Sequence, residues 1–200
     1  MIWKTDISPL IKEIELRNQP VIIRVNKFDE KSAAEFTAKI AAAHSSGQKV
    51  IPVVIDSYGG QVYSLMSMIS AIKSSELPIA TIAEGKAMSC GAVLLTFGED
   101  GMRFADPNAT IMIHDVSAGA QGKVEEMKAD VAEADRLDEK IYTMMARNCG
   151  KKDDYFKKKV FQRKHADWFI DPADAKRHNI INHLRIPKIT VKVAVDIDFE

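Results

Sequence analysis

The sequence predicts an α/β fold in which helices cover a largely parallel sheet. Short apolar runs alternate with longer amphipathic segments through the first half of the chain. The run at 50–56 is apolar almost throughout, which is typical of a strand covered on both faces. A helical stripe follows at 62–72, and a second apolar run follows at 79–83. Parallel strands end at one edge of the sheet, where α/β folds carry their ligand-binding loops.

Composition restricts the functional classes. The chain has 200 residues, 46% apolar and 28% charged, as expected for one globular domain. Basic and acidic residues number 28 each, so overall charge gives no reason to expect nucleic-acid binding. No apolar run is long enough for a bilayer, and the N-terminus does not resemble a secretory signal, so we expect a cytoplasmic protein with no membrane partner. Cys90 and Cys149 have no zinc-ligand spacing, which predicts reduced thiols and no metal or cofactor.

The N-terminal part is expected to contain an arm, one strand and one helix. Residues 1–20 are weakly patterned, with a few apolar residues at helical spacing. The run at 21–25 predicts a strand. A helix then begins at Asp29 or at Ser32, because either side chain can cap it.

The second half contains the longest helical pattern in the chain. A strand is predicted at 110–114, and His114 ends it. The helical pattern over 123–148 has a narrow apolar stripe between many charges, which favours packing against another helix, including one from another subunit.

The C-terminal part is expected to contain one more helix and two strands. Asp171 followed by proline is typical of a capped helix start. A short strand is predicted at 180–184. Within 186–200, apolar and polar residues alternate, which predicts a half-buried C-terminal strand.

Ser89 stands where a predicted strand becomes a predicted helix. The apolar run at 79–83 lies before it, and the helical segment at 92–97 follows. At a helix N-terminus, free backbone N–H groups and the helix dipole stabilise negative charge on a nearby oxygen. Serine is also a common helix cap, so a purely structural role for Ser89 remains an alternative.

The chain contains the groups that serine hydrolysis requires. That chemistry needs a nucleophile, a base, an acid that orients the base, and donors for the oxyanion. Ser89 can be the nucleophile, and His114 can take its proton and return it to the leaving amine. The loop at Gly59 and Gly60 offers backbone amides, and several carboxylates follow the long helix.

Five short motifs resemble those of a known family. The serine and the histidine among them are separated by 25 positions. In order and spacing the motifs resemble the proteolytic subunit of the ATP-dependent Clp protease, and the match runs from Asp56 to Gly150. The motifs are Asp56-Ser57-Tyr58-Gly59-Gly60, Ala87-Met88-Ser89-Cys90-Gly91-Ala92, Pro107-Asn108, Ile111-Met112-Ile113-His114 and Gln121-Gly122. The resemblance implies one spiral α/β domain over residues 1–200, of the kind shared with the crotonase superfamily, with a long protruding helix.

The resemblance also implies roles for individual residues. Ser89 matches the nucleophile and His114 the base, while the amides of Gly60 and Cys90 match the oxyanion donors. The positions that match substrate-binding residues are Gly59, Gly119, Gln121 and Gly122.

The orienting acid of the family precedes a phenylalanine just before the last helix. That position matches Asp167 in Asp167-Trp168-Phe169. The segment before it is longer than in the family pattern, so Asp171 and Asp174 are alternatives.

Implied partners follow from the same resemblance. The subunits form stacked rings in which the helix at 123–149 meets the opposite ring, and the enclosed sites cleave unfolded polypeptides or short peptides. An unfolding ATPase is implied as well. Residues 1–20 do not resemble the N-terminal loop of the family, and Pro52 and Val54 replace aromatic residues that help dock the ATPase, so this partner is left open.

Two other functions remain as alternatives. One is a catalytically degenerate subunit that assembles without cleaving; Tyr58 and Asp115 stand where the family pattern has proline and glutamine. The other is acyl-CoA chemistry on the crotonase scaffold, in which the Ser89 and His114 pair would have no role. The pair therefore favours the peptidase.

Overall fold

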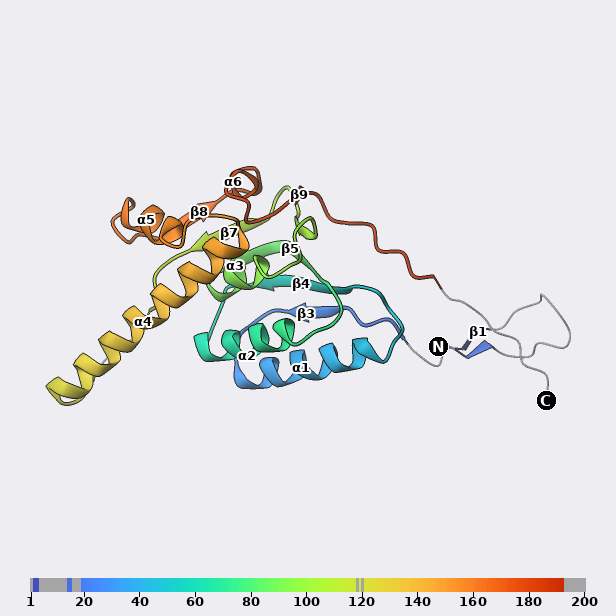
Figure 1. Ribbon diagram of the computed structural model, residues 1–200, viewed down its shortest axis with the longest axis horizontal. Coiled ribbons are helices and arrows are strands. Elements are labelled where there is room, and N and C mark those ends of the chain that lie inside the picture. The colour runs from blue at the N-terminus through green and yellow to red at the C-terminus, as the bar shows by residue number, and fades with distance from the viewer. Residues whose placement is uncertain (1, 4–13, 16–18, 118, 120, 193–200) are drawn as a thin grey trace, which may run out of the picture.

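The computed structural model describes residues 2–3, 14–15, 19–117, 119 and 121–192 (Figure 1). Strand β1 (Ile2–Trp3) pairs antiparallel with β2 (Ile14–Glu15). The helical stripe expected within 1–20 lies mostly outside the described residues. Where it reaches Ile14 the expectation is wrong, because Ile14 belongs to a strand.

Seven strands form the main sheet, and parallel pairing dominates it. In the order β3-β4-β5-β6-β9, each strand is parallel to its neighbour. The strand β7 also pairs parallel with β5, and β8 pairs antiparallel with β7. The strands are β3 (Ile23–Val25), β4 (Ile51–Ser57), β5 (Ile79–Met88), β6 (Arg103–Ala105), β7 (Thr110–Ile113), β8 (Trp168–Ile170) and β9 (His183–Leu184). The α/β prediction with a largely parallel sheet is therefore confirmed.

The sheet forks along β5. Residues Thr81–Ala83 of β5 pair with β6, and residues Lys86–Met88 pair with β7. The two-stranded β7–β8 ribbon therefore lies beside the carboxyl end of β5. That end carries the candidate nucleophile.

Helices lie on both sides of this sheet (Figure 1). The helices α1 and α2 pack together beside β3 and β4, while α5 and α6 lie beyond the β7–β8 ribbon. The helices are α1 (Glu30–His44), α2 (Val62–Lys73), α3 (Cys90–Leu95), α4 (Val124–Asn148), α5 (Tyr155–Phe161) and α6 (Pro172–Arg177). Asp29 caps α1 by accepting a hydrogen bond from the Ser32 amide, so the first of the two expected helix starts is confirmed.

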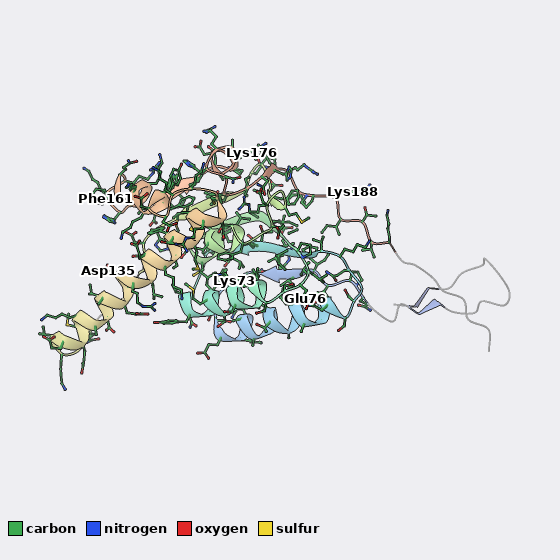
Figure 2. The ribbon with its side chains drawn as sticks, in the orientation of Figure 1. Lys73, Glu76, Asp135, Phe161, Lys176 and Lys188 are labelled. Atoms are coloured by element: carbon green, nitrogen blue, oxygen red, sulfur yellow. The ribbon has the colours of Figure 1, made fainter. Side chains whose placement is uncertain are left out.

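The long helix α4 projects from the body of the molecule (Figure 1). Its buried residues begin at Leu137, so only its C-terminal part packs on the rest of the chain. Side chains in the outer part, with Asp135 among them, stand out around the helix (Figure 2). The narrow apolar stripe in the sequence agrees with this arrangement, because the outer half of the helix buries none of its described residues.

One cluster of buried apolar residues joins the sheet to its helices. Along β4, Ile51, Val53 and Ile55 are buried, while the alternate residues Pro52 and Val54 are only half-buried. The expectation that β4 is covered on both faces is therefore wrong, because no element of the described chain fully covers the second face.

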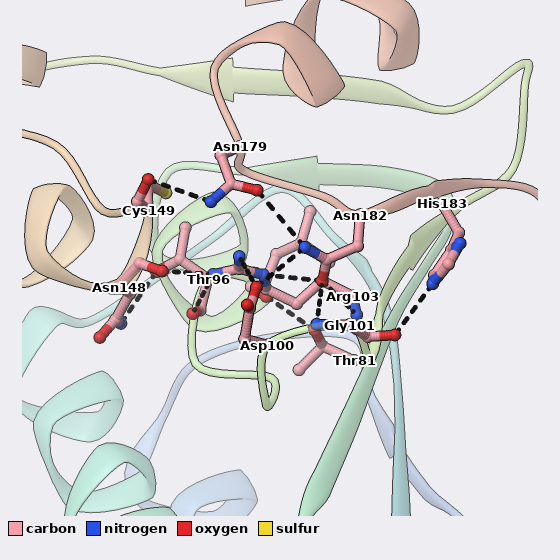
Figure 3. Close-up of polar contacts among 11 residues, drawn as sticks. Thr81, Thr96, Asp100, Gly101, Arg103, Asn148, Cys149, Asn179, Asn182 and His183 are labelled. Carbon is pink, nitrogen blue, oxygen red and sulfur yellow. Dashed lines mark hydrogen bonds and ion pairs between the residues drawn. The ribbon is translucent and has the colours of Figure 1, made fainter.

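A buried arginine ties the end of α4 to the sheet (Figure 3). Arg103 on β6 is 1% exposed, and its Nη1 donates to the Asn148 carbonyl at 2.6 Å. Its Nε and backbone N–H both donate to Asn182 Oδ1, at 3.2 and 3.0 Å. A cation at a helix C-terminus also interacts favourably with the helix dipole.

The C-terminal expectations have mixed outcomes. Asp171 caps α6 with proline at its first position, as predicted. The strand β9 is shorter than the predicted 180–184. Residues 186–192 form no strand, and 193–200 lie outside the described residues, so the C-terminal strand stays a prediction.

Candidate active site

Ser89 occupies a strained turn between β5 and α3. The strand runs to Met88, beyond the predicted end at 83, and α3 begins at Cys90. The Ser89 backbone has φ 53° and ψ −122°, a combination that residues with a side chain rarely adopt. Its amide donates to the Met112 carbonyl at 2.8 Å, which fixes the turn against β7. Strain of this kind clusters at active sites, and a serine on a sharp strand-to-helix turn is well exposed for attack.

The Ser89 side chain does not act as a helix cap. Ser89 holds the cap position of α3, but its hydroxyl makes no capping hydrogen bond. Its carbonyl oxygen accepts from the amides of Ala92 and Val93 instead. The side-chain capping bond expected under the structural alternative is therefore absent, and the hydroxyl is not engaged in a cap.

Two glycines allow the neighbouring loop to approach Ser89. Gly59 has φ +109°, and a Cβ built on it would lie 2.7 Å from Ser89 Cβ. Gly60 has φ +149°, and a Cβ there would lie 2.3 Å from the Phe28 carbonyl oxygen. Only glycine fits either position, because any side chain would meet rigid atoms.

The loop leaves one amide free beside the serine. The Gly59 amide donates to Ser57 Oγ at 3.1 Å, and the Gln61 amide donates to the Phe28 carbonyl at 2.8 Å. Among the described residues, neither the Gly60 amide nor the Cys90 amide donates to an oxygen. These two amides are the ones expected to hold an oxyanion.

A cavity of about 120 Å³ joins these groups. Ser89, His114, Gly60 and Cys90 all line it, so four of the expected site residues come together. Its walls are otherwise mainly apolar side chains from α2, α3, β7 and α4. These are Val62, Val93, Ile113, Ile141 and Met145.

The cysteine in the cavity wall is a poor nucleophile. Burial raises the pKa of Cys90 to about 11, against the opposing effects of the Gly60 backbone and the Ser89 hydroxyl. The thiol is therefore protonated at neutral pH, and Sγ donates to the Gly60 carbonyl at 3.3 Å. Cys149 is buried as well, and both cysteines are free thiols, as expected.

His114 and Asp167 stand at the open end of the β7–β8 ribbon. The last ladder pair is Ile113 with Trp168, and one further step in the same register would pair His114 with Asp167. Directly opposite residues in an antiparallel pair point to the same face, with Cβ atoms about 5 Å apart. In the described part of the chain, however, no hydrogen bond joins His114 to Asp167 or to Ser89, and Asp167 is exposed.

The two alternative acids are engaged elsewhere. Asp171 Oδ1 accepts from the Asp174 amide at 2.8 Å, which is its capping contact. Asp174 forms an ion pair with Arg177 within α6. Register and these competing contacts therefore favour Asp167 over both alternatives.

The expected substrate segment is not brought to the cavity. Gly119, Gln121 and Gly122 are exposed, and no strand forms among the described residues of 117–122. Gly122 abuts the Glu126 side chain at the start of α4. A role in binding extended substrate stays a prediction for these residues.

A polar cluster beside His114 was not predicted from the sequence. Asp115 Oδ1 accepts from the Tyr142 hydroxyl at 2.7 Å, and Asp115 Oδ2 lies 2.5 Å from His165 Nδ1. Burial raises the pKa of Tyr142, and the hydrogen bond to Asp115 raises it further. These residues come from the loop after β7, from α4 and from the segment before β8, so no sequence motif connects them.

Asp138 is the other carboxylate at this corner. It accepts from the Val116 amide at 2.7 Å, and burial raises its pKa. Among the described residues no group of three or more histidine, cysteine or acidic side chains could hold a metal ion. None of the described helices is long and apolar enough to cross a membrane.

Comparison with known proteins assigns the family. The Clp protease family model matches residues 11–186. The chain is 31% identical over 171 residues to the ATP-dependent Clp protease proteolytic subunit 3 of Nocardia farcinica, which covers 84% of this chain and 76% of the relative. It is 30% identical over 154 residues to subunit 1 of Rhodopirellula baltica, covering 76% of this chain and 66% of the relative. With this match over most of its length, the chain belongs to the Clp protease family.

Proposed function

We propose that the protein is a serine endopeptidase that cleaves unfolded polypeptides or short peptides inside an oligomeric chamber. The observation that carries the proposal is the strained, non-capping Ser89, which shares one cavity with His114 and two free amides. Ser89 is the nucleophile, His114 the base and Asp167 the acid that orients it. The names of the relatives support the same class of reaction.

The first half of the reaction forms an acyl-enzyme. Ser89 Oγ attacks the carbonyl carbon of the scissile peptide bond while His114 takes the hydroxyl proton. The carbonyl oxygen becomes an oxyanion, which the Gly60 and Cys90 amides stabilise. The tetrahedral intermediate then expels the amine, which receives the proton from His114.

The second half releases the new carboxyl end. Water attacks the ester carbonyl, and His114 takes a proton from the water. The same two amides hold the second oxyanion. Ser89 leaves with the proton held by His114, so the enzyme returns to its starting state.

Assembly into rings is supported by the outer part of α4. Val124, Met127 and Val131 are 65%, 40% and 56% exposed on the projecting helix, and they line a shallow cavity of about 420 Å³. Apolar side chains in this arrangement favour a protein partner, which we take to be a second copy in stacked rings. Docking of an ATPase and a cytoplasmic location remain proposals from the sequence.

Peptide hydrolysis by matched serine variants tests the proposal. We expect Ser89→Ala to abolish hydrolysis of an unfolded polypeptide and of a short fluorogenic peptide. Ser117→Ala is the control, because Ser117 lines the same cavity but is exposed at its rim. Light scattering should show the same oligomer for all three proteins. Equal turnover by Ser89→Ala and the unmodified protein would contradict the proposal.

A catalytically degenerate subunit is the second candidate. It is favoured by the absence of hydrogen bonds between Ser89, His114 and Asp167 among the described residues. Catalytic contacts are often loose in a free enzyme and tighten on substrate binding, so the peptidase remains the better account. A stable oligomer with no hydrolysis by the unmodified protein would favour the degenerate subunit.

A further inference from the structure

Among the described residues, one side-chain hydrogen bond joins the segment that carries Asp167 to the residues just after β7. No regular element spans 162–167, between α5 and β8, and Lys164 and His165 both have positive φ, 57° and 60°. The β7–β8 ladder stops at Trp168. Beyond it, His165 Nδ1 lies 2.5 Å from Asp115 Oδ2.

Asp115 is itself held by a second element. Its other oxygen accepts from the Tyr142 hydroxyl at 2.7 Å, and Tyr142 is 2% exposed on α4. The carboxylate therefore bridges a rigid helix and an irregular segment. The bridge joins residues that are far apart in the sequence: Tyr142 and Asp115 are separated by 27 positions, and His165 and Asp115 by 50.

We propose that Asp115 is a positioning residue that holds the segment carrying Asp167 against the end of β7. This inference rests on the proposed function, because Asp167 matters only if His114 acts as a base. His165 lies two residues before Asp167, and Asp115 lies one residue after His114. The contact between them therefore fixes the distance that the acid must cross to reach the imidazole.

The contact contributes to geometry rather than to overall stability. The His165 and Asp115 side chains are 59% and 31% exposed, and exposed ion pairs contribute little to folding. A displacement of about 1 Å in an active site can lower the rate about 100-fold. Loss of the contact should therefore lower kcat strongly without unfolding the protein.

Two substitutions of His165, by Asn and by Asp, are nearly isosteric with each other and differ mainly in whether they can keep the hydrogen bond to Asp115. Both Asn and Asp tolerate positive φ, so neither should strain position 165 more than histidine does. His165→Asn keeps an N–H donor that can reach the Asp115 carboxylate. His165→Asp instead opposes two carboxylates.

The experiment measures kcat, KM and amide hydrogen exchange over 162–170 in the full-length protein. We expect His165→Asp to lower kcat about 10- to 100-fold with KM nearly unchanged, and to speed exchange in this segment. His165→Asn should stay close to the unmodified protein in both readouts. Lys158→Asp is the matched control, because it reverses a charge beside Asp154 in an exposed ion pair on α5.

The outcomes test the role of Asp115 and the proposed peptidase function separately. Unchanged exchange in His165→Asp, or equal loosening by His165→Asn, would overturn the role of the contact. If the unmodified protein does not hydrolyse peptides, the proposed function falls, while the exchange measurement still shows whether Asp115 holds the segment.

Discussion

At the scale of single residues, close backbone approach explains the geometry of the site. Ser89 and Gly59 both adopt positive φ, and they do so where two loops meet. The approach leaves no room for a Cβ at Gly59, and Gly60 lines the same cavity as Ser89. The site therefore depends on backbone conformation as much as on reactive side chains.

A glycine substitution tests this dependence. Gly59→Ala should lower kcat at least about 100-fold, because the new Cβ would displace Ser89. We expect a loss of about 1–3 kcal/mol in the free energy of unfolding as well. Gly47→Ala is the control: Gly47 also has positive φ, +76°, but nothing lies within 4 Å of its Cβ position. Retention of full activity by Gly59→Ala would contradict the account.

At the scale of elements, the site depends on how α4 and the β7–β8 ribbon are anchored. Ile141, Tyr142 and Met145 on α4 line the cavity, so the position of this helix sets one wall. The end of α4 is in turn fixed by Arg103, whose buried guanidinium donates to the Asn148 carbonyl. Anchoring at this end leaves the outer half of α4 free to project.

Removal of that anchor should weaken the whole fold. Arg103→Met leaves the Asn148 carbonyl without the guanidinium donor, whereas Asn182 Oδ1 keeps the backbone amides of Gly101 and Arg103. We therefore expect a loss of about 1–3 kcal/mol in the free energy of unfolding. Arg147→Met is the control, because Arg147 pairs with Asp153 at the surface and should leave stability almost unchanged. Urea unfolding measures both. Equal stability of the two variants would refute the anchoring role of Arg103.

Some helices and strands could be predicted from the sequence, and others could not. The strand β4 could be predicted from its long apolar run, and the helices α2 and α4 could be predicted because each is long enough to show the helical period. The strand β8 and helix α5 were missed, because β8 has three residues and α5 has seven, within a mixed basic stretch. The missed β8 is the strand that brings Asp167 toward His114.

At the scale of the whole molecule, the sheet order brings the site together. Ser89 follows β5 and His114 follows β7, and these two strands are neighbours although β6 lies between them in the sequence. The motifs and their spacing pointed to both residues as candidates, but periodicity cannot give the order of strands. The cluster of Tyr142, Asp115 and His165 could not be predicted for the same reason, since its members meet only in the folded chain.

The central claim is that Ser89 is an activated nucleophile, and its most direct test is covalent labelling of this serine. The oligomeric protein would be treated with a fluorophosphonate probe, and the modified residue would be located by peptide mass spectrometry. We expect one adduct, on Ser89, which is lost in Ser89→Ala, greatly slowed in His114→Ala and unchanged in Ser117→Ala. An adduct on another residue, or no adduct in a folded and oligomeric sample, would contradict the claim that Ser89 is an activated nucleophile.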